Sequence, residues 1–282
     1  MVAEPSETGR DRRYPRAPER IPVGTIDQGR YRARFASTEA DLDCILRLRF
    51  EVFNLELGEG LDTSHETGRD EDVFDLHCHH LLVEDTRGAG VVGTYRMQCW
   101  EMADQAGFYS ANEFDLSGLR PEVVTNSVEI GRACISREHR NRQILFLLWK
   151  GLARYMTTNG KRYLFGCCSL TSQDPLEGLH ALAHLEAEGY LHPTVHIDPL
   201  PGFECRSEQS LPHPLPPFDL PLLFKTYLRY GALVCGPPAL DREFKTIDFL
   251  VLFDIQAMDP RTYELFFEER PPREEPWTES RP

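Results

Sequence analysis

The chain has 282 residues, of which 41% are hydrophobic, and this is enough to bury the core of one large domain or of one and a half. Its formal net charge of −14 argues against nucleic acid as a partner and against general attraction to an anionic membrane. The eight cysteines form no CxxC pair, and no apolar signal peptide precedes Arg30, so we expect reduced thiols in a cytoplasmic protein.

The first part of the chain predicts a leader, a strand and a helix. Residues 1–28 are rich in proline, arginine and glutamate and lack hydrophobic periodicity, which predicts a disordered leader. Residues 31–36 alternate in polarity and predict a strand. Ser37 is expected to cap a helix that continues to Asn54. Periodicity alone would place Arg49 of this helix in solvent.

An acidic loop and a hairpin follow. Residues 56–75 show no hydrophobic period, which fits either a mobile lid or a plain surface loop. Residues 78–84 and 90–99 predict two hairpin strands, with Arg96 in the middle of the second. Three histidines and a cysteine occupy positions 77–80, but strand alternation places neighbours on opposite faces. No second ligand pair has suitable spacing, so no metal site is expected.

The centre of the chain predicts a strand, a basic turn, a helix and a second strand. The strands are expected at residues 128–135 and 162–168, and the amphipathic helix at 143–159. The turn at 136–142 carries three arginines and a histidine. A strand that leads into a basic turn at a helix N-terminus is typical of phosphate binding, since free N–H groups and the helix dipole converge there.

The remaining chain predicts an extension that packs on this core. Residues 179–189 and 220–230 have helical patterns, and residues 244–254 are expected to pair into the main sheet. The proline-rich stretch 199–221 is either a rigid linker or an interfacial segment. The predicted organisation is a leader at 1–28, a core at 29–198, an extension at 199–267 and a disordered tail at 268–282.

The strand, turn and helix resemble motif A of the GCN5-related N-acetyltransferase superfamily, V-x-P-x-x-R-G-x-G-x-G. Arg140 keeps its place, but Asn141, Gln143 and Leu145 stand at the glycine positions. A Cβ at these positions obstructs close backbone approach to a pyrophosphate. The resemblance therefore favours a donor with a single phosphate, the phosphopantetheine of acyl carrier protein, with acyl-CoA as the alternative and no tightly bound cofactor.

Two narrower resemblances concern acyl transfer. The order and spacing of seven residues are similar to the signature of the acyl-homoserine-lactone synthases: Arg49, Phe53, Asp72, Asp75, Arg96, Glu129 and Arg132. Over residues 31–257 the chain resembles the ornithine-lipid N-acyltransferases, notably in EIGRACI and in LPLLFKTYLRYGALVCGPPALDREFKTIDFLVLFD. That family moves a 3-hydroxyacyl group from acyl carrier protein to the α-amine of ornithine. The implied fold is α/β (α+β), a GCN5-related N-acetyltransferase-like twisted mixed β-sheet flanked by helices.

The resemblance implies roles for individual residues. Glu129 is the expected base for the acceptor ammonium. Arg132 either binds the substrate carboxylate or orients Glu129, and Ser169 assists the departing thiol. Backbone N–H groups of Ala133, Cys134 and Ile135 are expected to hold the thioester oxygen. An ion-pair cluster is expected to shape the amine pocket beside Arg49 and Phe53, and its members are Asp72, Asp75 and Arg96.

A local excess of basic residues predicts a donor-docking face. Arg137, Arg140 and Arg142 belong to a basic stretch between residues 132 and 162, although the whole chain is acidic. Such a reversal of sign suits an acidic carrier protein as partner. The alternatives are a CoA-dependent N-acetyltransferase of another amine and a non-catalytic acyl- or lipid-binding module.

An apolar segment raises the question of membrane contact. A product with one acyl chain partitions reversibly into a bilayer. The candidates for peripheral contact at the inner membrane face are Leu211, Leu215, Phe218, Leu220, Leu222, Leu223 and Phe224. The alternative is that these side chains only cover the sheet.

Overall fold

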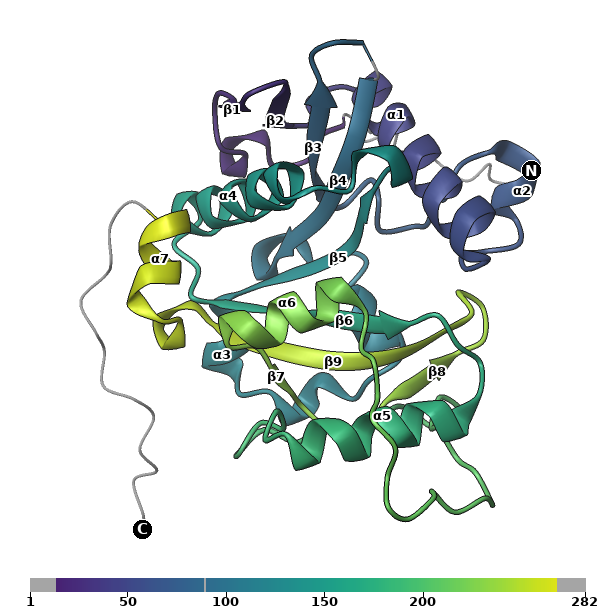
Figure 1. Ribbon diagram of the computed structural model, residues 1–282. Helices are drawn as coiled ribbons and strands as arrows, with labels where there is room; N and C mark the ends of the chain where they lie inside the picture. Colours follow the sequence, from purple (N-terminus) through teal and green to yellow (C-terminus); the bar gives the residue numbers. More distant parts are fainter. Residues whose placement is uncertain (1–13, 89, 268–282) are drawn as a thin grey trace, which may run out of the picture.

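The computed structural model describes residues 14–88 and 90–267, and the described residues form one nine-stranded sheet flanked by helices (Figure 1). The strands are β1 Ile26–Gln28, β2 Tyr31–Phe35, β3 His79–Asp85, β4 Gly90–Cys99, β5 Ser127–Ile135, β6 Tyr163–Leu170, β7 Leu233–Val234, β8 Ala239–Asp241 and β9 Thr246–Asp254. Their order is β1-β2-β3-β4-β5-β6-β9-β7, with β8 on β9. Among the strand pairs of the described residues, β5–β6 alone is parallel. The expected mixed sheet is confirmed.

Helices of several lengths connect the strands. The α-helices are α1 Glu39–Phe50, α2 Ser64–Thr67, α3 Pro121–Thr125, α4 Arg142–Thr158, α5 Pro175–Ala187, α6 Leu222–Tyr230 and α7 Pro260–Phe266. The 3₁₀ turns are η1 Pro18–Arg20, η3 Trp100–Met102, η4 Tyr109–Asn112, η5 Leu116–Gly118, η6 Arg137–His139 and η7 Ile255–Ala257, and η2 Glu51–Leu57 is a π-helical continuation of α1. None of the described helices has both the length and the apolar composition that a bilayer crossing demands.

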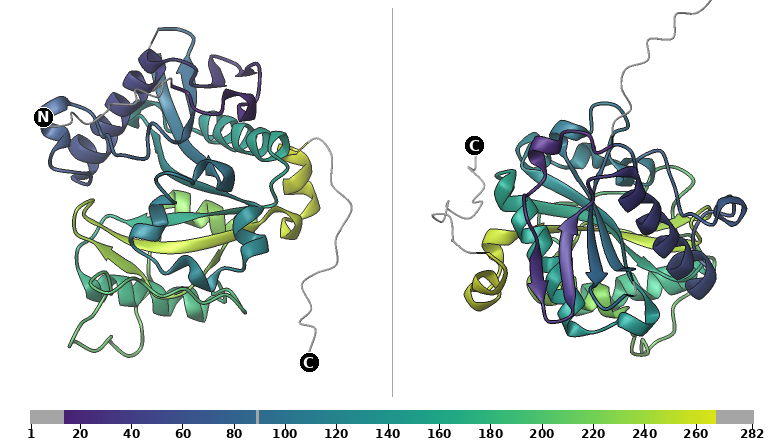
Figure 2. Two further views of the ribbon diagram at one scale, coloured as in Figure 1. Left: turned by 180° about the vertical axis from the view of Figure 1, so that it is seen from behind. Right: turned by 90° about the horizontal axis from the view of Figure 1, so that it is seen from above.

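Helices α1 and α4 cover opposite faces of the sheet (Figure 2). Leu81 packs in the core with the buried side of α4, whereas its neighbour Leu82 packs against Ile45 of α1. Adjacent strand residues point to opposite faces, so the two helices sandwich the sheet. The cap of α1 is Thr38 and not Ser37, because the Thr38 hydroxyl and the Asp41 carboxylate form a reciprocal capping box.

The predicted leader is ordered from residue 14 onward, so that expectation does not hold for residues 14–28. Strand β1 pairs with β2, and the Arg16 carbonyl accepts a hydrogen bond at 2.7 Å from the buried His79 ring. These contacts were not visible in composition because they depend on distant parts of the chain. Residues 1–13 and the predicted tail at 268–282 lie outside the described residues.

The C-terminal extension completes the sheet. Strand β9 pairs with β6 along eight positions, from Tyr163↔Asp254 to Leu170↔Ile247, which confirms the expected pairing of residues 244–254. Helix α6 is closed by Gly231 in the left-handed conformation, at φ 104°. Its Phe224 packs against Phe249 of β9. The extension therefore supplies a strand that is paired on both sides and one wall of the site described below.

Candidate active site

The parallel strands β5 and β6 diverge after three paired positions. They pair at Ser127, Val128 and Glu129, and no pairing follows toward the end of β5. At the point of divergence Gly166 lies so close to β5 that a Cβ would stand 2.1 Å from the Ile130 carbonyl oxygen. The separation of the two strands opens the sheet at its centre.

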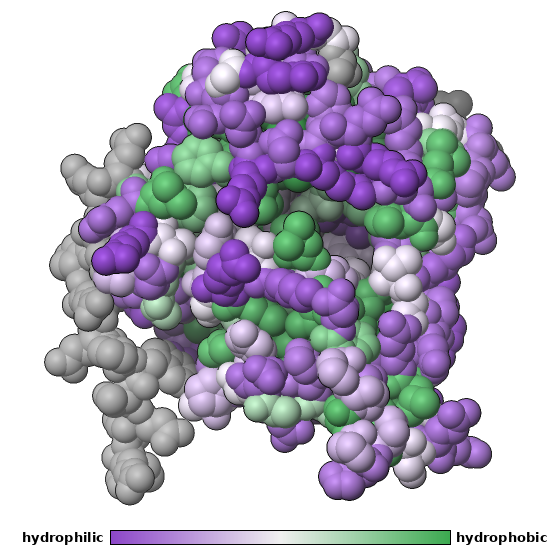
Figure 3. Space-filling model, in the orientation of Figure 1, coloured by the Kyte–Doolittle hydropathy of each residue, from purple (hydrophilic) through white to green (hydrophobic). Residues whose placement is uncertain are grey.

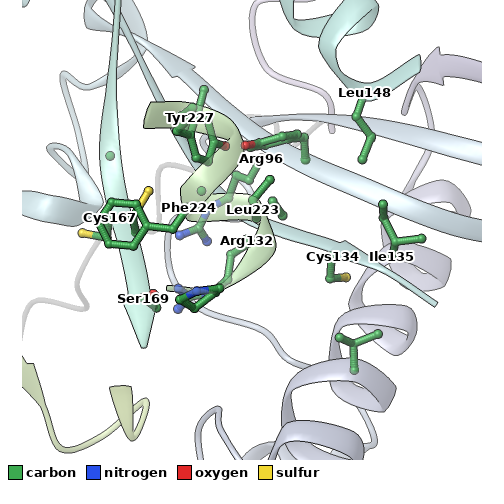
Figure 4. Close-up of a pocket in the computed structure, with 18 of the residues that line it drawn as sticks. Arg96, Arg132, Cys134, Ile135, Leu148, Cys167, Ser169, Leu223, Phe224 and Tyr227 are labelled. Atoms are coloured by element: carbon green, nitrogen blue, oxygen red, sulfur yellow. The ribbon is translucent and has the colours of Figure 1, made fainter. Parts of the chain in front are cut away.

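A large cavity fills this opening. It has a volume of about 610 Å³ and is lined by residues of β4, β5, β6, α4 and α6. Figure 4 shows labelled residues of three elements around the space: Cys167 and Ser169 of β6, Arg132, Cys134 and Ile135 of β5, and Phe224 and Tyr227 of α6. Figure 3 shows the corresponding hollow bordered by apolar residues. Its size and apolar lining suit an acyl chain with its thioester.

A β-bulge on β5 redirects the backbone along the cavity. Thr94 pairs with Cys134 but Arg96 pairs with Gly131, so Arg132 and Ala133 together oppose one residue of β4. Arg132 accordingly has a positive φ of 49°. Ser136 N–H bonds to the Val92 carbonyl, and because the ladder alternates, Cys134 also faces β4. The N–H of Ile135, next to Cys134 in the alternating ladder, therefore points away from β4. Ala133 lies in the bulge, where the alternation is interrupted.

Arg49 is buried, not exposed as periodicity alone suggested. Its guanidinium donates to Asp70 at 2.7 Å and to Asp75 at 2.5 and 3.2 Å, and all three side chains are 1% exposed. Burial would raise the pKa of Asp75, but Arg49 and Arg96 lower it well below its usual range. Asp70 was not among the expected site residues, although it lies in the acidic loop. The end of the loop, from Asp70 to Asp75, thus carries buried ion pairs, whereas other loop residues such as Glu66 and Glu71 are exposed.

The ion-pair cluster continues across the sheet to β5. Arg96 donates to both Asp72 oxygens at 2.7 Å and to Asp75 at 3.0 Å. Arg132 donates to Asp72 at 3.2 Å, and its guanidinium lies between the Tyr109 and Phe244 rings, 4.5 and 4.0 Å from their centroids. The cluster therefore unites the expected aspartates and arginines. Phe53 contacts the Phe244 ring, and both side chains line the large cavity beside Arg132.

Glu129 lines the large cavity and is 7% exposed. Its carboxylate accepts hydrogen bonds from the backbone N–H groups of Tyr109 and Ser110, both at 2.8 Å, and from the Ser110 hydroxyl. Burial raises the pKa of Glu129 above its ordinary value, although these hydrogen bonds lower it in part. Arg132 forms its ion pair with Asp72 and not with Glu129. The Glu129 carboxylate is therefore oriented by the N–H groups of Tyr109 and Ser110 and by the Ser110 hydroxyl.

Ser169 lies at the cavity beside a carboxyl pair that the sequence did not reveal. It is exposed and stands directly opposite Asp248 in the β6–β9 register. Asp248 and Glu113 are buried and neighbour Cys167, with one ligand atom of each within 4.8 Å of the others. Burial raises the pKa of both Glu113 and Asp248. The neighbouring Asp248 raises the pKa of Glu113 further, whereas hydrogen bonds from Ser169 and Glu113 lower the pKa of Asp248 in part. Burial likewise raises the pKa of the Cys167 thiol, which disfavours its use as a metal-binding thiolate.

The expected donor loop lies at the start of α4. Arg137 and Arg142 are exposed, whereas Arg140 donates to both Glu56 oxygens at 2.7 and 2.8 Å and to the Ile135 carbonyl. The Asn141 side chain accepts from the N–H groups at 143 and 144, so the helix N-terminus is capped by its own residue. Lys161 and Arg162, at the far end of the basic stretch, pair with Glu101 and Asp254.

Two of the histidines at 77–80 form hydrogen bonds in the protein interior. His79 hydrogen-bonds to Tyr155 at 2.8 Å, and His80 to the Asp75 carbonyl at 3.0 Å. Burial lowers the pKa of both rings to about 4, so both are neutral near pH 7. Their contacts lie on opposite faces of β3, as alternation predicted.

Comparison with known proteins identifies the family. The acetyltransferase (GNAT) domain model matches residues 48–150. An L-ornithine N(alpha)-acyltransferase of Brucella abortus (strain 2308) is 31% identical over 247 residues, covering 83% of this chain and 87% of that protein. Its counterpart in Rhizobium meliloti (strain 1021) is 33% identical over 248 residues, covering 81% of each. The solved structure of FeeM, an N-acyl amino acid synthase from uncultured soil microbes, matches with a TM-score of 0.48 and 11% identity over 84% of this chain and 95% of that one. Because the two L-ornithine N(alpha)-acyltransferases match over most of its length, the chain belongs to the L-ornithine N(alpha)-acyltransferase family and is an acyltransferase.

Proposed function

We propose that this acyltransferase moves a 3-hydroxyacyl chain from the phosphopantetheine thioester of acyl carrier protein to the α-amine of ornithine. The observation that carries this proposal is the opening between β5 and β6, which joins an apolar cavity to a buried charged cluster at Arg132. The names of the two relatives support ornithine as the acceptor.

The reaction needs a free amine. The α-ammonium loses one proton to Glu129, whose raised pKa suits a base better than an ordinary carboxylate does. Arg132 binds the acceptor carboxylate beside the cavity, since its guanidinium lies at the cavity wall against the rings of Tyr109 and Phe244. The amine nitrogen then attacks the thioester carbonyl carbon.

The tetrahedral intermediate places negative charge on the former carbonyl oxygen. Backbone N–H groups of the bulged stretch from Ala133 to Ile135, whose residues line the cavity, hold this oxygen. When the C–N bond has formed, the C–S bond breaks. The second ammonium proton passes to the departing thiolate with help from the Ser169 hydroxyl, so charge and protons balance.

A donor with one phosphate fits the start of α4. The Asn141 side chain already occupies two of the helix N-terminal N–H groups that would otherwise hold a pyrophosphate. The exposed Arg137 and Arg142 stand at this same end and suit the acidic surface of a carrier protein. Incubation with 3-hydroxyacyl carrier protein or 3-hydroxyacyl-CoA, each with a panel of amino acids, tests donor and acceptor together by mass spectrometry. Acyl-ornithine formed equally from CoA would contradict the donor assignment.

The docking face gives a sharper test. Changing Arg137 and Arg142 together to Glu should raise the KM for acyl carrier protein about 10-fold or more at low salt, and less at high salt, because exposed charges are screened. The matched control is the pair Arg87→Glu and Arg261→Glu, which makes the same change in net charge at exposed positions elsewhere. Equal KM values for the two double variants would remove this face from the proposal.

A further inference from the structure

A second, smaller cavity adjoins the large one. It has a volume of about 290 Å³ and lies between the loops at 61–74, 109–113, 202–203 and 240–243. Tyr109 and Arg132 line both cavities and form the wall between them. A molecule in the small cavity can therefore present one end at Arg132, next to the opening between β5 and β6.

Four carboxylates line the small cavity, and their surroundings differ. Asp72 is paired with Arg96 and Arg132, and Asp241 accepts from the backbone N–H groups at 243 and 244, both at 2.8 Å. Glu243 is exposed. Glu113 is 2% exposed, and neither of its oxygens accepts a hydrogen bond from a described N–H or O–H donor. Its polar neighbour is the Asp248 carboxyl group.

A buried carboxyl group without a donor is costly unless another group satisfies it. Glu113 is held in place by its backbone, which donates to the Ser110 carbonyl at 3.2 Å and accepts from the N–H of Leu200 at 2.7 Å. Burial and the neighbouring Asp248 carboxyl group both raise the pKa of Glu113, which disfavours two negative charges at adjacent carboxyl groups when no cation is present. An added cation in the cavity would complete this site.

We propose that the small cavity is the acceptor's side-chain subsite, in which Glu113 binds the distal ammonium of a diamino acid while Arg132 holds its α-carboxylate. The proposal rests on the proposed function and adds the group that selects the acceptor. The distance between the two ends sets the chain length of the diamino acid. A neutral amino acid of the same length leaves Glu113 unsatisfied and is disfavoured.

Substrate comparison in Glu113→Gln tests the subsite. The parent should use ornithine in preference to norvaline, which has the same carbon chain without the distal amine. Glu113→Gln should lower kcat/KM for ornithine about 10- to 100-fold, as expected for a lost charge-assisted hydrogen bond, and leave kcat/KM for norvaline unchanged. Glu264→Gln on α7, the same change at an exposed position, is the control. Equal losses with both substrates, or no loss, would overturn the proposal.

A second variant guards against a simple folding defect. Glu113→Asp keeps the charge but withdraws it by one methylene, so preference should move from ornithine toward lysine, which is one methylene longer. A gain with lysine cannot arise from misfolding, whereas an unchanged ornithine-to-lysine ratio would count against the subsite.

Binding without donor separates this proposal from the proposed function. Ornithine should raise the melting temperature of the parent more than norvaline does, and Glu113→Gln should abolish the difference. If the parent forms no N-acyl product with any amino acid but shows this difference, the transfer reaction fails and the subsite stands. If the parent makes N-acyl-ornithine and shows no difference, the subsite fails alone.

Discussion

Glu129 is placed to act as a base because it is buried, lines the large cavity and is held by three hydrogen bonds from the segment at 109–110. Glu129→Gln keeps the shape and removes the proton acceptor, so kcat should fall by about 10² to 10⁴. The measurement is turnover per folded molecule, with folding followed by circular dichroism. A lower melting temperature with most of the turnover retained would assign Glu129 to structure instead.

The pH profile provides a control for this role. The Ser110 hydroxyl helps to lower the pKa of Glu129 against the effect of burial. Ser110→Ala removes that hydrogen bond, so the pKa should rise further and the acid limb of kcat/KM should move to higher pH, since the base acts only when ionised. Thr125→Ala, which removes a surface hydroxyl bonded to Pro121, should leave the limb in place. An acid limb that does not move in Ser110→Ala would contradict the assignment.

Residue identities in the site were only partly predictable. The resemblance to the acyl-homoserine-lactone synthases predicted an ion-pair cluster of Asp72, Asp75 and Arg96. The structure shows the ion pairs among these residues, and it adds Arg49 to them. Glu113 was missed because it lies in an irregular segment without a motif, and its partner Asp248 comes 135 residues later. Asp248 lies on β9, whereas Glu113 is positioned by its backbone hydrogen bond with Leu200, and no local pattern encodes the proximity of two such distant segments.

The divergence of β5 and β6 is the feature of the secondary structure on which the site depends. Gly166 lies where the strands part, and a Cβ there would stand 2.1 Å from a backbone oxygen. Gly166→Ala should therefore lower the free energy of unfolding by about 1–3 kcal/mol and reduce turnover, because the strands must shift apart. Urea denaturation and turnover of the same preparations provide the measurement.

Gly131 offers a matched control on the other strand. A Cβ at this position would meet no atom within 4 Å, although Gly131 also lines the large cavity. Gly131→Ala should keep the parent's free energy of unfolding. Equal destabilisation of the two variants would show that close packing at Gly166 is not what positions the opening.

Long periodic elements were predictable and short ones were not. The strand 128–135 and the helix 143–159 differ from β5 and α4 by about one residue at their ends, because hydrophobic periodicity and the caps at Asn141 and Asn159 act locally. β1 and β8 have three residues each, too few to show a period, and their pairing depends on neighbouring strands. Helix α1 was predicted as one helix, but its last turns are π-helical.

Across the whole molecule, the chain order of the strands differs from their order in the sheet. β9 lies between β6 and β7, so the extension cannot be removed without exposing the edge of β6 (Figure 1). The sequence predicted that β9 would join the sheet, but the family resemblance, not composition, supplied the overall architecture. Helix α6, which connects to this region, covers the large cavity from the same extension.

The expected membrane candidates separate into covered and exposed side chains. Leu220 and Phe224 are buried, and Phe218 is half-buried with its ring 5.0 Å from that of His180. Leu222 is 74% exposed, and Leu57 is 38% exposed. Both line the large cavity, so they mark its mouth. Most side chains of this segment therefore pack against the rest of the protein. Leu222 and Leu57 are the residues that could contact a bilayer.

An acyl product must leave the cavity past this mouth. Each CH₂ that enters a bilayer contributes about 0.8 kcal/mol, so a mouth held against lipid would aid release of a single-chain product. We expect Leu222→Ser with Leu57→Ser to reduce co-sedimentation with neutral phosphatidylcholine vesicles and to leave the melting temperature unchanged, since neither side chain is buried. Leu265→Ser on α7, where the leucine is 49% exposed away from the cavity, is the control and should sediment like the parent. The contact must be apolar, because a net charge of −14 gives no electrostatic attraction to an anionic surface. If the parent does not sediment, or if the control loses sedimentation equally, apolar contact at the cavity mouth is without support.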